Sequence, residues 1–245
     1  MTIASLKDVG KRFPNGIEAL AGFNISLAAG EKVSLLGPSG CGKSTALRIL
    51  SGLETATTGV VSNELPAQGA LAFVFQDPTL LPWATVAKNI AMPLGLADVA
   101  QGEIDTRVTE MLTRVELSEF TDSYPHELSG GMKMRVSIAR ALITRPSLLL
   151  MDEPFAALDE ITRFRLNDML LEQQAQEGFA LLFVTHSVFE SVYLSDRVAV
   201  MSPRPGKIVA EIKTAPKTKR NSGFRLSAKY IELCRKVSGA LDAAS

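Results

Sequence analysis

Short apolar runs separated by helical patterns are the main hydrophobic feature of this chain. The runs at residues 32–36 and 180–185 predict strands. The run at 147–151 predicts a central strand that is buried on both faces of a parallel sheet. A helix is predicted at 44–50, directly after the first strand, and it ends at Gly52. Up to about residue 84 the chain otherwise alternates strands and turns.

From residue 85 to 135 the pattern becomes helical. Ser129 stands directly before a helix that the Arg145–Pro146 pair stops. Other apolar positions recur at helical spacing and form one stripe: Ile104, Val108, Met111, Leu112 and Val115. This region therefore predicts a small helical subdomain with its own core.

The C-terminal segment is less informative. Residues 207–213 predict a strand, and 213–220 form a basic, loop-like stretch. A terminal amphipathic helix is predicted by the apolar residues Phe224, Tyr230, Ile231, Cys234, Val237 and Leu241. We expect this helix to dock on the rest of the chain, and a membrane-surface or regulatory role is the alternative.

Residues 37–44 have the spacing G-x-x-x-x-G-K-S between a predicted strand and a predicted helix, which is typical of a phosphate-binding loop, or P-loop. Glycines let backbone N–H groups surround phosphate oxygens, and the helix N-terminus adds its positive dipole end. Lys43 can reach the β- and γ-phosphates, and the Ser44 hydroxyl is a ligand for Mg²⁺. A glycine-rich turn without a ligand is the alternative. The predicted nucleotide contacts are Gly37, Pro38, Ser39, Gly40, Cys41, Gly42, Lys43, Ser44 and Thr45.

Two carboxylates follow the predicted central strand. Asp152 is placed to hold the Mg²⁺ shell, and Glu153 is placed to act as general base for an attacking water. Taken alone, this pair would be better explained as a solvated loop. Its combination with the P-loop favours the catalytic interpretation.

A second anion site is predicted where the helix after Ser129 begins. The Ser129 hydroxyl and the N–H groups of Gly130 and Gly131 are suited to bind an anion there. The P-loop of the same chain already has its own helix N-terminus. We therefore expect the ATP of a second subunit to be the ligand of Ser129, Gly130 and Gly131.

Three motifs stand in a characteristic order: the P-loop, then Leu128–Met132 (Leu-Ser-Gly-Gly-Met), then the apolar strand that ends in Asp152 and Glu153. In this order they resemble the nucleotide-binding subunit of an ATP-binding cassette (ABC) transporter. The resemblance implies that the chain binds ATP and Mg²⁺ and hydrolyses ATP at a subunit interface.

The resemblance also implies a fold. It covers about residues 1–212 and indicates an α/β P-loop NTPase, the ABC cassette, with a RecA-like core and an antiparallel β-subdomain. A helical subdomain is inserted at about 85–135, and residues 213–245 form a C-terminal tail with the docking helix.

Individual residues match the family's motifs. Gln76 matches the glutamine that links the Mg²⁺ site to the transmembrane partner, and His186 matches the switch histidine that contacts the γ-phosphate. Ala157–Asp159 match the D-loop, which crosses the dimer interface. Phe13 is similar to the aromatic residue that stacks on adenine, with a place in the core as the alternative. The implied catalytic residues are Lys43, Gln76, Glu153 and His186, and the implied metal ligands are Ser44, Gln76 and Asp152.

Four finer motifs resemble the subgroup of importers for nitrate, sulfonates, taurine and pyrimidine precursors: Gly37–Gly42, Leu80–Trp83, Met151–Phe155 and Ser202–Gly206. The implied partners are a second copy of the chain, transmembrane permease subunits and, indirectly, an extracytoplasmic solute-binding protein. Met134 departs from the family, which has glutamine there, so polar contacts at the interface are in question. The stretch 58–72 is shorter than usual, which we expect to trim a hairpin of the antiparallel subdomain.

The segment Leu80–Trp83 is an apolar cluster in a loop. Because such a cluster is unfavourable to expose, we expect a partner to cover it together with the Gln76 loop. The alternative is that Trp83 packs inside the helical subdomain.

Composition is compatible with this assignment. The chain has 245 residues, 46% of them hydrophobic, and 26 basic side chains balance 26 acidic ones. This balance leaves no basic field for nucleic acid. The longest apolar run, 179–184, is far below the ~18 residues of a membrane span, and the N-terminus lacks a signal-peptide core. Cys41 and Cys234 are the only cysteines, which favours a reducing cytosol, and Cys41 is expected to be an ordinary P-loop residue rather than a reactive thiol.

We therefore expect a peripheral protein on the cytoplasmic face of a bacterial inner membrane. A soluble ABC ATPase of DNA repair or translation is the alternative, although such proteins usually carry a long coiled coil or two cassettes. A P-loop kinase or GTPase acting alone is disfavoured by Leu128–Met132, by His186 and by the lack of an obvious guanine-reading N-K-x-D motif.

Overall fold

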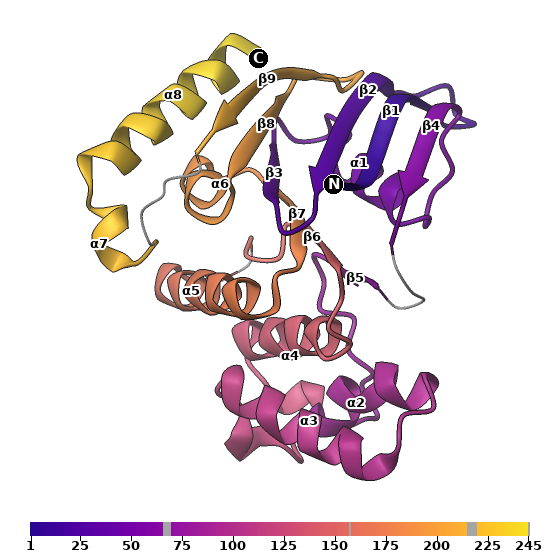
Figure 1. The fold of residues 1–245 in the computed structure, drawn as a ribbon, viewed down its shortest axis with the longest axis vertical. Coiled ribbons are helices and arrows are strands. Elements are labelled where there is room, and N and C mark those ends of the chain that lie inside the picture. The colour runs from indigo at the N-terminus through magenta and orange to yellow at the C-terminus, as the bar shows by residue number, and fades with distance from the viewer. Residues whose placement is uncertain (66–69, 157, 215–219, 245) are drawn as a thin grey trace.

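The computed structural model describes residues 1–65, 70–156, 158–214 and 220–244. Two sheets and a group of helices make up the molecule (Figure 1). In Figure 1 the antiparallel sheet lies beside the larger sheet at the upper right, and helices α2 and α3 lie at the bottom of the view. Within the described residues, no helix is both long enough and apolar enough to cross a membrane.

The larger sheet has six strands in the order β5-β6-β7-β3-β8-β9, and all neighbours are parallel except β8 and β9. Strands β6 and β7 are buried along their full length, which explains their continuous apolar runs. The strands are β3 (Lys32–Leu36), β5 (Leu71–Val74), β6 (Leu148–Asp152), β7 (Ala180–Thr185), β8 (Arg197–Met201) and β9 (Ile208–Lys213). The predictions at 32–36 and 180–185 are confirmed, and the one at 147–151 is displaced by one residue.

The smaller sheet is antiparallel, with the order β2-β1-β4. Its strands are β1 (Thr2–Arg12), β2 (Glu18–Ala28) and β4 (Thr58–Asn63). Along β2, alternate residues are buried, so one face packs on the core that also contains helix α1 (Lys43–Leu50). The chain then returns to the larger sheet through β5.

The helical region begins at α2 (Val86–Leu96), where the Thr85 side chain accepts a hydrogen bond from the Lys88 N–H. The expected stripe is buried on α3 and just beyond its end. The remaining elements are α3 (Gln101–Arg114), the 3₁₀ turns η1 (Ser118–Phe120) and η2 (Pro125–Glu127), and α4 (Gly130–Leu142). Helix α4 contacts both α2 and strand β5, so it joins the helical region to the larger sheet.

The C-terminal half adds α5 (Glu160–Glu177), α6 (Val188–Leu194), α7 (Ser222–Arg225) and α8 (Ala228–Ala244). The predicted terminal amphipathic helix is α8, which contains Tyr230, Ile231, Cys234, Val237 and Leu241, whereas Phe224 lies in the separate short helix α7. Helix α8 buries Tyr230, Cys234 and Val237 against α6 and β8. Most of the basic stretch 213–220 lies outside the described residues.

Candidate functional site

The P-loop joins the end of β3 to the start of α1 and has the backbone that a phosphate cradle requires. Gly40 and Gly42 have φ values of 74° and 106°. A Cβ atom on Gly42 would lie 2.7 Å from the carbonyl oxygen of Ala19, so a larger residue would clash there as well as being strained. The loop therefore needs glycine at this position, and it leaves the first N–H groups of α1 available to an anion.

Lys43 is buried, and its ammonium folds back over the loop. Its Nζ atom donates hydrogen bonds to the carbonyl oxygens of Gly37, at 2.8 Å, and Pro38, at 2.9 Å. These acceptors are neutral, so they hold the side chain in place without cancelling its charge. Phosphate oxygens are acceptors of the kind that a lysine in this position can bind.

The hydroxyl of Ser44 donates a 2.7 Å hydrogen bond to Oδ1 of Asp152, the last residue of β6. Burial is the largest influence on this carboxyl and raises its pKa above the ordinary value, while the hydrogen bond from Ser44 acts in the opposite direction. A hydroxyl and one carboxylate suit Mg²⁺, which usually keeps several waters and binds through few protein ligands plus substrate phosphates. The described residues contain no cluster of three or more acidic, histidine or cysteine side chains that could hold a metal.

Glu153 and His186 come together because β6 and β7 are neighbouring parallel strands that end at the same edge. His186 Nδ1 lies 3.5 Å from Oε2 of Glu153. Glu153 has a φ of 47°, unusual for a residue with a side chain, and its N–H donates to the carbonyl oxygen of Val184. The backbone is thus held in a rare conformation at the residue expected to be the general base.

Sequence reasoning missed Glu190, whose side chain contacts Thr185, the residue directly before His186. It is buried, and its carboxylate accepts a 2.5 Å hydrogen bond from the Thr185 hydroxyl and lies 3.3 Å from Arg163 Nε. Burial raises the pKa of Glu190, and the Thr185 hydrogen bond and Arg163 oppose that shift. The available signal was Ser187 three residues before Glu190, because Ser187 caps α6 by accepting from the Glu190 N–H.

Gln76 follows β5 and is exposed, and no contact places it at the Ser44–Asp152 pair in the described structure. The loop after it is tied to helix α4 by Arg140. The Arg140 guanidinium donates to the carbonyl oxygens of Pro78 and Thr79, both at 2.9 Å. These hydrogen bonds hold the loop after Gln76 against helix α4.

Ser129 is exposed at the N-cap of α4, and its hydroxyl accepts from the Met132 N–H at 3.3 Å. Within the part of the chain that is described, no hydrogen bond links it to the P-loop of its own chain. Met134, in the same helix, is only 3% exposed and belongs to the hydrophobic core. The methionine thus packs inward, where the family's glutamine would need a polar partner.

The remaining sequence-predicted contacts are Phe13 and the D-loop, Ala157–Asp159. Phe13 is half-buried, and Lys11 Nζ lies 5.0 Å from the centre of its ring. Ala157 lies outside the described residues. Its neighbour Leu158 is buried, and Asp159 caps α5 by accepting from the Thr162 N–H at 2.9 Å.

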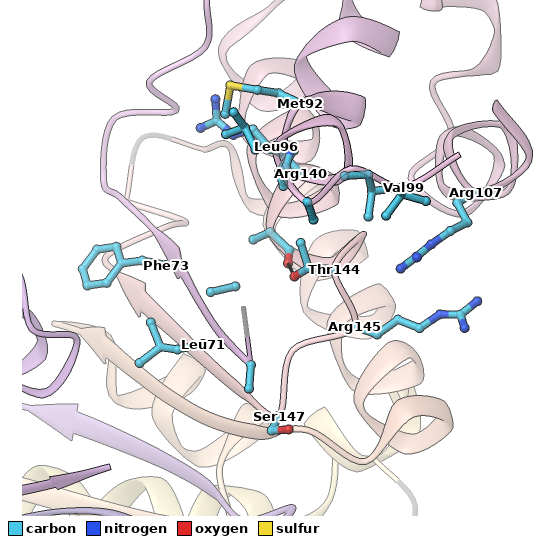
Figure 2. A pocket seen from close by; sticks show the side chains of 16 residues that line it. Leu71, Phe73, Met92, Leu96, Val99, Arg107, Arg140, Thr144, Arg145 and Ser147 are labelled. Atoms are coloured by element: carbon cyan, nitrogen blue, oxygen red, sulfur yellow. Dashed lines mark hydrogen bonds between the residues drawn. The ribbon is translucent and has the colours of Figure 1, made fainter. Parts of the chain in front are cut away.

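A groove of about 570 Å³ opens between the edge strand β5, helix α2 and the end of α4. Figure 2 shows Leu71 and Phe73 on one side, Met92 and Leu96 on another, and Arg107 with Arg145 at one end. Trp83, in the loop before α2, is 74% exposed, so the alternative that it packs inside the helical subdomain is wrong, and its exposure is compatible with the expected docking role.

Cys41 is buried, and burial raises the pKa of its thiol while Lys43 opposes the shift. A protonated, covered thiol is a poor nucleophile. Cys41 is therefore a small packing residue of the loop, as expected.

Comparison with known proteins gives a consistent result. Residues 20–156 match the family model described as ABC transporter. The chain is 50% identical over 207 residues to an aliphatic sulfonates import ATP-binding protein, SsuB 1, of Pseudomonas syringae pv. syringae, covering 84% of each chain. It is 40% identical over 235 residues to the SsuB protein of Bacillus cereus, covering 92% of each.

Solved structures of similar fold include a dimeric ATP-binding cassette in a post-hydrolysis state, bound to ADP and phosphate. Its TM-score is 0.77 at 31% identity, and the match covers 87% of this chain and 99% of that one. The cbiO1 protein from Clostridium perfringens, part of an ABC transporter complex, has a TM-score of 0.79 at 26% identity, over 99% and 96% of the two chains.

Proposed function

Because this chain belongs to the ABC transporter family and is an ATPase of that family, we propose that it energises an importer of aliphatic sulfonates or a closely related small solute. The identity to sulfonate import proteins over most of both chains is the observation that carries this proposal. Taurine, nitrate and pyrimidine precursors are the other candidate solutes.

In the proposed site, bound MgATP supplies the phosphoryl group that is transferred to water. The P-loop N–H groups and Lys43 bind the phosphates, and Ser44 with Asp152 holds the Mg²⁺. Glu153 accepts the proton of the attacking water, and His186 contacts the terminal phosphate. The 3.5 Å separation of His186 Nδ1 from Glu153 Oε2 supports a joint role for these side chains.

A second copy would complete each site. Ser129 and the start of α4 would form an anion site, and among the described residues no hydrogen bond links Ser129 to the P-loop of its own chain. In a head-to-tail dimer, Ser129 of one copy would face the ATP held by the P-loop of the other. The similar cassette solved as a dimer with ADP and phosphate bound supports the pairing of two copies.

The groove between β5 and α2 is the proposed docking site of the permease. Its walls are largely apolar, Arg107 and Arg145 stand at one end, and the exposed Trp83 lies in the loop that leads into α2. A short permease helix with an apolar face and an acidic end would suit this surface. Movement would reach it through the segment after Gln76, which Arg140 ties to α4.

Replacing Trp83 by alanine should weaken permease-stimulated ATP hydrolysis more than basal hydrolysis. The indole is exposed, so its loss removes docking area without opening a cavity in the core. The measurement is ATPase activity of the variant alone and with the permease in proteoliposomes. Leu53→Ala, at another exposed apolar side chain, is the matched control. Equal loss of both activities would contradict a docking role for Trp83.

The importer proposal itself is tested with a deletion strain. Loss of the gene should abolish growth on aliphatic sulfonates as sole sulfur source, and membrane proteins should co-purify with the tagged protein from native membranes. Taurine, nitrate and a pyrimidine precursor are supplied separately to identify the solute. Normal uptake of every solute, with no membrane protein co-purifying, would favour an ABC ATPase without a transport role.

A further inference from the structure

The turn between β8 and β9, residues 202–207, packs along one side of the P-loop. A Cβ atom on Gly37 would lie 3.1 Å from Cβ of Met201, the last residue of β8. At the other end of the turn, a Cβ atom on Gly206 would collide with the carbonyl oxygen of Cys41. The backbones of the turn and the P-loop are therefore in close contact at both ends of the turn.

Hydrogen bonds fix the shape of this turn. The N–H of Ser202 donates to the carbonyl oxygen of Lys207 at 2.9 Å, and the Lys207 N–H donates to the Ser202 hydroxyl at 3.1 Å. Gly206 is anchored to β2, because its N–H donates to the Ala19 carbonyl oxygen at 2.9 Å. A side chain on this turn is thus presented to the P-loop from a defined backbone.

Arg204 is the side chain that reaches across. Its Nε and Nη2 atoms both donate to the carbonyl oxygen of Gly40, at 3.1 and 2.9 Å. No ion pair of Arg204 with a carboxylate occurs in the described part of the chain. The guanidinium therefore brings an uncompensated positive charge to the P-loop backbone, at an exposed position beside the phosphate cradle.

The contact with Arg204 fixes the orientation of the Gly40–Cys41 peptide group. A trans peptide is planar, so its C=O and N–H point in opposite directions. By holding the Gly40 carbonyl toward the turn, Arg204 directs the N–H of Cys41 to the opposite side. There the Cys41 N–H donates a long, 3.3 Å hydrogen bond to the carbonyl oxygen of Pro38. A phosphate oxygen would be a stronger acceptor for that N–H.

The positive charge of Arg204 also favours phosphate binding by the Cys41 N–H. A cationic donor on the carbonyl polarises the peptide and makes its N–H a better donor. Gly40 has a φ of 74°, and a glycine adopts positive and negative φ values about equally readily. The Gly40–Cys41 peptide therefore depends on an external contact to stay in one orientation.

We propose that Arg204 is a positioning residue for nucleotide binding, which orients and polarises the Gly40–Cys41 peptide so that its N–H binds a phosphate oxygen. The inference goes beyond the proposed transport role, since it concerns ATP and ADP affinity alone. It also assigns a task to the turn Ser-Pro-Arg-Pro-Gly, which the catalytic mechanism does not use.

Equilibrium binding of a fluorescent ADP analogue tests the proposal without hydrolysis. Arg204→Ala should raise the dissociation constant about tenfold, the typical scale of one lost charge-assisted hydrogen bond. Arg204→Lys, which keeps the charge and one donor, should give an intermediate value. In ATP hydrolysis, Arg204→Ala should raise KM and leave kcat within about twofold, the pattern of lost uniform binding.

The control is Lys207→Ala, which removes an exposed positive charge from the same turn and leaves the Gly40 contact intact. It should bind the ADP analogue as the unmodified protein does, and all three variants should keep the same melting temperature. Unchanged binding in Arg204→Ala would overturn the proposal. So would equal weakening in Lys207→Ala, which indicates a general charge effect, or a lowered melting temperature with equal losses in affinity and kcat, which indicates a structural role.

Discussion

Replacing Glu153 by glutamine should lower ATP turnover by ~10²-fold or more, the usual contribution of a general base, while ATP still binds. The amide has nearly the same shape as the carboxylate but cannot accept the proton of the attacking water. The P-loop contacts of Lys43 and the Ser44–Asp152 pair do not involve Glu153, so the phosphate and metal contacts remain. The variant should accumulate as an ATP-bound dimer.

The measurements are steady-state ATPase activity, equilibrium ATP binding and size-exclusion chromatography with ATP. Glu160→Gln is the matched control, because Glu160 is an exposed carboxylate at the start of α5 and should tolerate the same change. Hydrolysis by Glu153→Gln at a rate near that of the unmodified protein would show that Glu153 is not the base.

The elements that the sequence predicts well are those whose pattern is set by local burial. Strand β7 is a continuous apolar run and β3 is mostly apolar because both strands are buried within the sheet, so their bounds follow from the pattern. The error at β6 has the same origin. Because Asp152 is polar, the apolar pattern predicts that the strand ends before it. In the structure Asp152 is buried and pairs with Val184 of β7.

The parts that sequence reasoning missed depend on tertiary contacts. Phe224 lies in α7 rather than in the terminal helix, and its ring packs near Tyr193, as does the ring of Tyr230 from α8. For Trp83 the hydrophobic pattern left two positions open, a partner-covered loop and the helical core, and its exposed side chain excludes the core. Arg204 reaches a P-loop carbonyl 164 positions away, which no local periodicity can indicate.

The site was more predictable than these contacts because its motifs are local and the topology brings them together. Glu153 and His186 each follow a buried strand, and parallel neighbours end at one edge. Ser129 is the exception. It follows a loop and starts a helix in the same chain, and its expected partner is on another copy.

Mixing two inactive variants should restore activity if Ser129 acts across a dimer interface. Lys43→Ala removes the ammonium that the P-loop carbonyls hold, and Ser129→Arg places a bulky side chain at the exposed N-cap of α4. In a head-to-tail mixed dimer, one site then carries both defects and the other carries neither. An equal mixture should therefore show about a quarter of the unmodified activity, since half of randomly formed dimers are mixed and each has one intact site of two.

The mixed dimer is best produced by co-expression with two different tags and sequential purification, so that its activity is measured free of both parent dimers. A mixed dimer that carries Lys43→Ala and Ser129→Arg on the same chain, beside an unmodified chain, is the control. There each site has one defect, so activity should stay near that of the parent variants. If the first mixed dimer is as inactive as this control, Ser129 does not complete a site that can work alone on the neighbouring copy. If the first mixed dimer is active and the control is not, the exposed N-cap of α4 binds the nucleotide held by the other subunit. Both dimers carry the same two substitutions, so only a site shared between subunits can make their activities differ.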